Sequence, residues 1–184
     1  MSTQATEDSS LERLRALLLG EGGLMASLVD GESSSDRLSV NADAESPARV
    51  AASGPRIDGR GSEYELLLEA IYEGYLLHYH APRIVLAPED DLGLLAGDRL
   101  YALGLARLVE LGDIEGVAEL ADVIALSALV HGAAQPELAD AIWIAGARAL
   151  GWGSNPQYEQ AKALVRAGSP KALEALRAFA EVGA

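Results

Sequence analysis

The amino-acid sequence predicts an all-α protein built as an antiparallel helical bundle. Its long apolar segments are rich in Ala, Leu, Glu and Arg, which favour helices, and aromatic residues make up only 5% of the chain. Apolar residues in these segments recur at helical spacing, and no segment shows the alternation that is typical of a strand. Glycine, proline and capping residues mark a start and a stop for each predicted helix. Short connections between such helices favour antiparallel packing.

The first part of the chain differs in composition from the rest. Residues 1–10 are polar and acidic, so we expect a disordered tail and no signal peptide. Four leucines share one side of a helix predicted over 11–19, and glycines end it. Residues 30–62 are rich in Ser, Gly, Asp and Arg and have no sustained period, which predicts a flexible linker. The predicted parts are an N-terminal tail and short helix (1–29), the linker (30–62) and a helical bundle domain (63–184).

Boundary signals place each helix of the bundle. Ser62 and Glu65 form a capping box that opens the first helix, and Pro82 stops it. Pro88 opens the second helix, whose acidic first turn suits the helix dipole, and Gly112 ends it. The remaining helices are predicted over 114–131, 136–150, 156–167 and 170–182.

Charge and composition argue against several classes of protein. The formal charge is −14, from 28 acidic and 14 basic residues, which disfavours binding to nucleic acid or to an anionic membrane. No apolar run reaches the roughly 18 residues that a membrane-spanning helix requires. The chain has no cysteine, which excludes disulfides and thiolate metal sites. We therefore expect a cytoplasmic protein.

Two short motifs follow each other in the bundle domain. The motif residues are Leu76, Leu77 and His78 at the end of the first bundle helix, and Leu95, Ala96, Gly97 and Asp98 in the second. Their order resembles the centre of the trans-polyprenyl diphosphate synthases, in which an LLHDDxxD helix is followed by an LAGDxLxA helix. In that family the aspartates after the histidine hold magnesium ions that bridge the allylic diphosphate. Here Tyr79 and His80 occupy those positions, and a phenol and an imidazole do not offer the hard oxygen ligands that magnesium requires.

Other positions depart from the family in the same direction. The loop is shorter, and Arg83 is the only basic residue where the family has a diphosphate-binding pair. No second DDxxD motif follows Gln135. The resemblance implies part of the isoprenoid synthase fold without chain-elongation activity, as in the non-catalytic small subunit of heteromeric polyprenyl diphosphate synthases. It implies a catalytic synthase subunit as the partner, or self-association, and no cofactor.

The tyrosines of the first bundle helix suggest where a contact lies. Tyr72, Tyr75 and Tyr79 have i, i+3, i+7 spacing and share one face. Such a stripe is either an aromatic seam in the core or the wall of an interface or pocket. The sequence hypothesis places the partner contact here, together with Leu100 and Leu103.

Two alternatives and one metal hypothesis remain to be weighed. The Ala- and Gly-rich helix over 95–106 leaves room for a cavity, so the chain alternatively binds an isoprenoid or another apolar small molecule without catalysis. A residual enzyme would use Asp90, Asp91 and Asp98 as magnesium ligands, but two helical turns, about 10 Å, separate Asp91 from Asp98. In a helix His78 and His80 point in different directions, so they would share a metal ion only if the chain were extended there. We predict no metal site.

Overall fold

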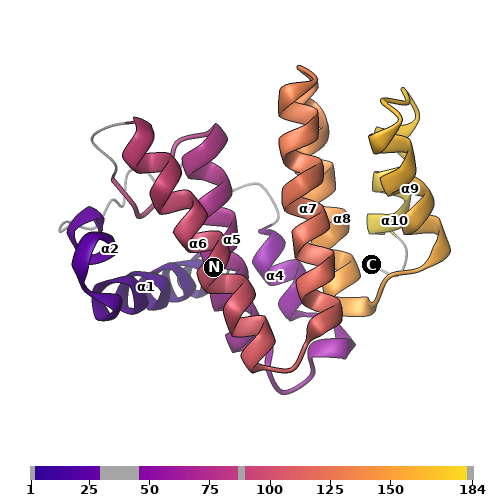
Figure 1. Ribbon diagram of the computed structural model, residues 1–184. Helices are drawn as coiled ribbons and strands as arrows, with labels where there is room; N and C mark the ends of the chain where they lie inside the picture. Colours follow the sequence, from indigo (N-terminus) through magenta and orange to yellow (C-terminus); the bar gives the residue numbers. More distant parts are fainter. Residues whose placement is uncertain (1–2, 30–45, 87–89, 182–184) are drawn as a thin grey trace. The chain divides into compact units, whose positions relative to one another are not determined.

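The computed structural model describes residues 3–29, 46–86 and 90–181, and these ranges form helices without any strand (Figure 1). The prediction of an all-α fold is confirmed. The chain divides into two compact units. Unit 1 comprises residues 1–44 and 62–110, and unit 2 comprises residues 45–61 and 111–184. None of the helices in the described ranges has the length and apolarity needed to cross a bilayer.

Unit 1 surrounds a core of aliphatic side chains. Its described helices are α1 (Thr3–Glu21), α2 (Gly23–Leu28), α5 (Gly61–Tyr79) and α6 (Asp90–Glu110). The buried residues of this core are Leu11, Leu14, Leu18, Met25, Leu28, Val29, Ala70, Ile84, Val85, Ala96, Leu100 and Leu103. The backbone N–H of Leu86 donates to Leu28 O at 2.7 Å, and one isolated β-bridge joins Val29 to Val85. The end of α2 is thereby tied to the segment that follows α5.

The beginning of α1 differs from the prediction. The helix expected over 11–19 is present, but α1 already begins at Thr3. The expectation of a disordered tail over 1–10 is therefore wrong from residue 3 onward. Ser10 is fully buried, so the polar composition of this stretch does not keep its inner end away from the core.

The predicted capping box takes part in a contact between helices. α5 begins at Gly61, ahead of both residues of the box. The Arg13 guanidinium of α1 donates to the Ser62 hydroxyl and, at 2.7 Å, to the Glu65 carboxylate. Ser62 therefore lies inside α5 and not at its N-cap, and the two side chains predicted to cap the helix bind α1.

Glycines allow α5 and α6 to pack closely. A β-carbon at Gly97 would lie 2.7 Å from the His78 ring and 3.0 Å from the carbonyl oxygen of Gly74. A β-carbon at Gly104 would collide with the Ile71 side chain. Real β-carbons do not approach other atoms so closely, so side chains at these positions would push the helices apart. Gly97 and Gly104 thus permit the close approach of α5 and α6.

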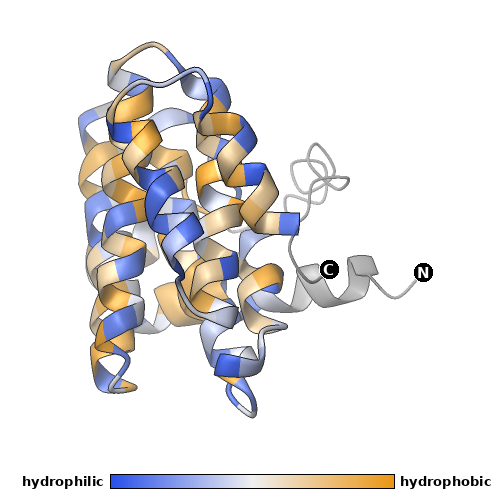
Figure 2. Ribbon diagram, turned by 90° about the vertical axis from the view of Figure 1, so that its right-hand side faces the viewer, coloured by the Kyte–Doolittle hydropathy of each residue, from blue (hydrophilic) through white to orange (hydrophobic). Residues whose placement is uncertain are grey.

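Unit 2 is arranged around α8. Its described elements are α4 (Pro47–Ala52), η2 (Pro55–Ile57), α7 (Ile114–Gly132), η3 (Pro136–Leu138), α8 (Ala139–Trp152), α9 (Pro156–Arg166) and α10 (Ala172–Glu181). α8 packs against α4, α7 and α10 and is buried over most of its length. The hydropathy colouring in Figure 2 shows hydrophobic and hydrophilic residues mixed within the long helices, as expected where one face of each helix is buried.

The start and stop signals in unit 2 are largely confirmed. α7 covers the predicted range, and the Asp113 side chain caps it by accepting from Gly116 N at 3.0 Å. Asn155 caps α9 in the same way, accepting from Tyr158 N at 2.9 Å. Pro136 opens a 3-10 turn and not the α-helix itself, which begins at residue 139. Pro88, predicted to open a helix of unit 1, lies outside the described residues.

The predicted linker and domain boundary do not match the structure. Residues 30–45 lie outside the described part of the chain, but α4 forms within the segment expected to be irregular. Pro47, Ala48, Val50 and Ala51 of α4 are buried. Small residues make this possible, since a β-carbon at Gly54 would collide with the backbone of Gly151 in α8. The linker prediction is wrong for α4, and unit 2 begins well before the predicted boundary at residue 63.

Candidate functional site

The end of α5 holds His78, Tyr79 and His80, which stand where the predicted resemblance would place a metal-binding segment. The His78 ring stacks on Tyr101 of α6, with centroids 5.3 Å apart and ring planes at 5°, and its Nε2 lies 3.2 Å from the Asp98 carboxylate. His80 lies just past the helix, where its Nε2 is 2.9 Å from the Tyr75 hydroxyl. The two imidazoles therefore have different partners and do not converge. Tyr79, between them, is 37% exposed.

No metal centre is evident in the described part of the chain, where no three His, Asp or Glu side chains are grouped to hold an ion. The side chain of Asp90, one of the three hypothetical magnesium ligands, lies outside the described residues. Asp98, another of the three, lies beside His78 of α5.

The segment after α5 is held by two buried glutamates. One oxygen of Glu73 accepts from the backbone N–H groups of Arg83, Ile84 and Val85 at 2.8, 2.7 and 3.1 Å. Its other oxygen accepts from Arg83 Nε at 3.1 Å. The Glu69 carboxylate lies 2.7 Å from the Arg83 guanidinium. One arginine and two buried carboxylates therefore form a closed ion-pair cluster between α5 and the segment that follows it.

The electrostatics of Arg83 follow from this geometry. Burial by itself would lower the pKa of Arg83, but the charges of Glu69 and Glu73 outweigh burial and raise the pKa above its ordinary value. The guanidinium also lies over the Tyr72 ring, 5.2 Å from its centroid. The only basic residue of the shortened loop is thus neutralised inside unit 1. A diphosphate would have to compete with two glutamates that are already in place.

The predicted contact residues fall into two groups. Tyr75, Leu100 and Leu103 are buried, at 1%, 0% and 8% exposure, so they present almost no surface to a partner. Tyr72 is half-buried and stacks on Tyr75, with ring centroids 5.6 Å apart. Of the aromatic stripe, Tyr79 presents the most surface. Most of the stripe is the aromatic seam that the sequence left open as the other possibility.

Several aliphatic side chains of α6 are exposed and do not pack into the core of unit 1. Leu95, a residue of the family-like motif, is 62% exposed, and Leu94 is 43% exposed. Val109, near the end of the helix, is 53% exposed. Ala96 and Gly97 of the same motif are buried against the rest of unit 1. Within the motif, Ala96 and Gly97 therefore pack into unit 1, whereas Leu95 faces outward.

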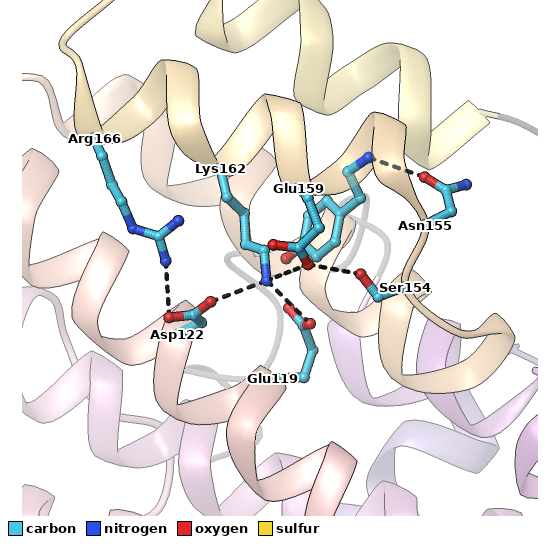
Figure 3. A network of polar contacts seen from close by, with 8 residues as sticks. Glu119, Asp122, Ser154, Asn155, Glu159, Lys162 and Arg166 are labelled. Carbon is cyan, nitrogen blue, oxygen red and sulfur yellow. Dashed lines mark hydrogen bonds and ion pairs between the residues drawn. The ribbon is translucent and has the colours of Figure 1, made fainter.

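A second polar cluster joins α7 to α9 in unit 2. The Lys162 ammonium, on a side chain only 4% exposed, lies 2.8 Å from Glu159, 2.9 Å from Asp122 and 3.4 Å from Glu119. Figure 3 shows these three carboxylates around the ammonium, with Arg166 bound to the far side of Asp122. The three N–H donors of the lysine face three acceptors.

Burial and charge act differently on the carboxylates of this cluster. Burial raises the pKa of Glu119, and the nearby Tyr158 hydroxyl and Lys162 ammonium only partly offset it. Burial also acts to raise the pKa of Asp122, but bonds from Lys162 and Arg166 outweigh it and lower the pKa. The hydrogen bond from Lys162 lowers the pKa of Glu159. One cluster therefore contains a carboxyl group that binds its proton more tightly than usual beside two that release it more readily.

An open cavity of about 430 Å³ adjoins this cluster. It is lined by Arg56, Glu115, Gly116, Ala118, Glu119, Asp122, Ala149, Leu150, Gly153, Ser154, Glu159 and Lys162. Arg56 is held on its rim by a two-pronged ion pair with Asp113, at 2.5 and 2.9 Å. Because both basic side chains of the lining are bound by carboxylates, the cavity offers no exposed cation for an anionic ligand.

Sequence reasoning missed both ion-pair clusters. The signal for the first is an i, i+4 pair of glutamates, Glu69 and Glu73, on the core face of an apolar helix, because buried carboxylates require a cation. The signal for the second is Lys162 at a position buried by the periodicity of α9. Neither signal identifies the oppositely charged residue that pairs with it in the fold.

The comparisons with known proteins add no assignment. No model of a known protein family, no curated protein and no solved structure matches this chain. The resemblance to the polyprenyl diphosphate synthases therefore rests on the motifs at residues 76–78 and 95–98 and stays a prediction.

Proposed function

We propose that this chain is a non-catalytic helical subunit that binds and modulates a catalytic polyprenyl diphosphate synthase. The observation that carries the proposal is the closed cluster of Arg83 with Glu69 and Glu73. In the family that the motifs resemble, basic residues of this loop bind the substrate diphosphate. Here the basic side chain serves the fold, and Tyr79 and His80 stand where magnesium ligands would be needed. The scaffold is kept while the groups that would bind the substrate are committed elsewhere.

The outward-facing part of α6 supports a partner-binding role. Leu95 and Val109 leave most of their surface uncovered by unit 1. Exposed aliphatic side chains along one helix face are typical of a helix that packs against a further helix. We expect the resulting complex in the cytoplasm.

The alternative, a carrier for an apolar small molecule, has less support. That hypothesis required the small residues of α6 to line an open cavity. Gly97 and Gly104 instead lie against His78 and Ile71, where a side chain would collide. These glycines bring two helices together and leave no space beside themselves for a prenyl chain.

Co-expression with a catalytic synthase that has both DDxxD motifs tests the proposal. We expect the two chains to co-purify and the complex to yield a different distribution of product chain lengths from the synthase alone. The chain by itself is expected to leave an allylic diphosphate unchanged. Turnover by the isolated chain would overturn the proposal, as would the absence of both a complex and a change in product length.

A further inference from the structure

One exposed face of α6 carries an apolar stripe that the described residues of unit 1 leave uncovered. The α6 stripe consists of Leu95, Ala102, Ala106 and Val109, all of which are exposed. Their spacing of i, i+7, i+11 and i+14 places them within an arc of about 60°. The stripe runs along roughly 21 Å of helix, given a rise of about 1.5 Å per residue. Leu105, which is half-buried, widens it on one side.

The geometry of the stripe suits a second helix. Leu95, Ala102 and Val109 repeat every seven residues, which is the spacing of one core position in a coiled-coil seam. The alanines in the middle let a facing backbone come close, while the larger side chains at both ends supply contact area. A stripe of four residues along one line is too narrow to bind a flat surface, and its width matches the apolar face of one amphipathic helix.

Charge determines which helix fits. Unit 1 contains 17 acidic and 6 basic residues, whereas unit 2 contains 11 and 8, which together make the 28 and 14 of the chain. The excess negative charge is thus concentrated in the unit that carries the stripe. A second copy of the chain would bring two such units together and would be repelled, whereas a helix with a basic rim would be attracted.

The charges beside the stripe agree with this balance. Asp91 and Asp98 lie near its first turn, and Glu110 follows its last residue. The two arginines of α6 are already paired, Arg99 with Glu21 at 2.6 Å and Arg107 with Glu110 at 2.9 Å. Because Arg107 binds Glu110, the exposed acidic groups that are not paired with an arginine of α6 are Asp91 and Asp98, near the first turn of the stripe.

We infer that the α6 stripe binds one amphipathic helix of another protein, with apolar residues at heptad spacing and a rim of lysine or arginine. The inference rests on the proposed function only in requiring a partner protein, and it specifies the chemistry of the contact. The partner's apolar residues cover Leu95 and Val109, and its basic rim lies against Asp91 and Asp98 near the first turn of the stripe.

Three synthetic peptides and the full chain test the inference. Each peptide has four heptads with the same leucine seam, and the rim is lysine, glutamate or serine. We expect the lysine peptide to bind tightest by fluorescence anisotropy, with an affinity that falls as salt is raised, and the glutamate peptide not to bind.

A pair of substitutions separates the stripe from general charge attraction. The double variant Leu95→Ser, Val109→Ser keeps the net charge, and we expect it to bind the lysine peptide on the order of tenfold more weakly. The control Leu129→Ser removes an exposed leucine of α7, 44% exposed, and is expected to bind like the parent chain. All three replaced side chains are exposed, so thermal unfolding is expected to change little and shows that the variants fold.

Each contrary result of these experiments leads to a different conclusion. Equal binding of the lysine peptide by the double variant and the parent chain would overturn the inference, because charge alone would then explain the affinity. Equal binding of the glutamate and lysine peptides would overturn the inference that the partner helix has a basic rim. Dimerisation of the chain that the double variant abolishes would assign the stripe to a second copy. If a catalytic synthase binds the parent chain and the double variant alike, this inference fails while the proposed function stands.

Discussion

Glu73 binds Arg83 through both of its carboxylate oxygens, one to the backbone N–H at 2.8 Å and the other to Nε at 3.1 Å. The glutamate is fully buried, so its charge depends on these bonds and on those from Ile84 and Val85. The contact fixes the direction of the chain as it leaves α5. It also removes the loop's cation from any role in binding an anion.

Glu73→Gln is expected to destabilise the protein by about 2–4 kcal/mol. The amide keeps the shape, but it loses the charge opposite the buried Arg83 and places an NH2 group where a carboxylate oxygen accepted a bond. Chemical denaturation measures the loss. Glu63→Gln is the control, because Glu63 is exposed in the first turn of the same helix, and a change within about 0.5 kcal/mol is expected there. Equal effects of the two substitutions would contradict the assigned role of Glu73.

Gly97→Ala tests the close packing of α5 against α6. The new methyl group would lie 2.7 Å from the His78 ring, so the ring or the helix must move, at a cost of about 1–3 kcal/mol. The matched control is Gly132→Ala at the end of α7, where a β-carbon has nothing within 4 Å. Ala favours a helix over Gly, so the control is expected to be neutral or stabilising by up to about 1 kcal/mol. Thermal unfolding distinguishes the two, and a stable Gly97→Ala variant would refute the close contact.

Lys162→Met removes the cation from the centre of three carboxylates. We expect the free energy of unfolding to fall by about 3 kcal/mol near neutral pH, because the nearly buried ammonium that pairs with several carboxylates is removed. Asp122 and Glu159 have lowered pKa values, so their stabilisation is present above their ordinary pKa range and is lost as pH falls through the folded-state values. The difference between parent and variant should therefore shrink on acidification. Lys171→Met, at an exposed lysine, is the control and is expected to have little effect at any pH.

Glu119→Gln is expected to have the opposite pH dependence. Burial raises the pKa of Glu119, so the folded state binds this proton more tightly than the unfolded state does. Its contribution favours folding at low pH and is lost as pH rises through the folded-state pKa. Glutamine does not titrate, so the variant should gain stability relative to the parent as pH rises from about 4, near the ordinary carboxyl pKa, through the raised folded-state pKa. Denaturation curves at several pH values measure the trend, and a relative loss at higher pH would show that the pairing with Lys162 outweighs burial.

Local signals in the sequence predicted many of the helix boundaries because their physical causes are local. Proline lacks an N–H, glycine accepts a left-handed turn and a capping side chain bonds within its own turn. Gly112, at φ 74°, follows the end of α6, and Gly168, at φ 61°, follows the end of α9, so both glycines occupy left-handed conformations where a helix stops. The prediction failed at α4, because small residues that are typical of loops also pack closely against another helix.

Long-range pairing had no such signal. Glu73 and Arg83 lie ten residues apart across the end of a helix, and Lys162 lies 43 residues from Glu119. The sequence contains more acidic than basic residues, so it does not say which carboxylate receives which cation. The same limit applies to α6, whose periodicity marks one apolar face as buried but does not say which side chains of the other helices cover it.

The sequence by itself determined that the chain is helical and where many of its helices begin and end, because backbone preference and capping act within a few residues. Only the tertiary structure decided that Arg83 and Lys162 are neutralised inside the fold, that α4 belongs to the core of unit 2, and that Leu95 faces outward. Those outcomes depend on which distant groups meet as helices pack, and burial makes each unpaired charge costly enough to require a partner.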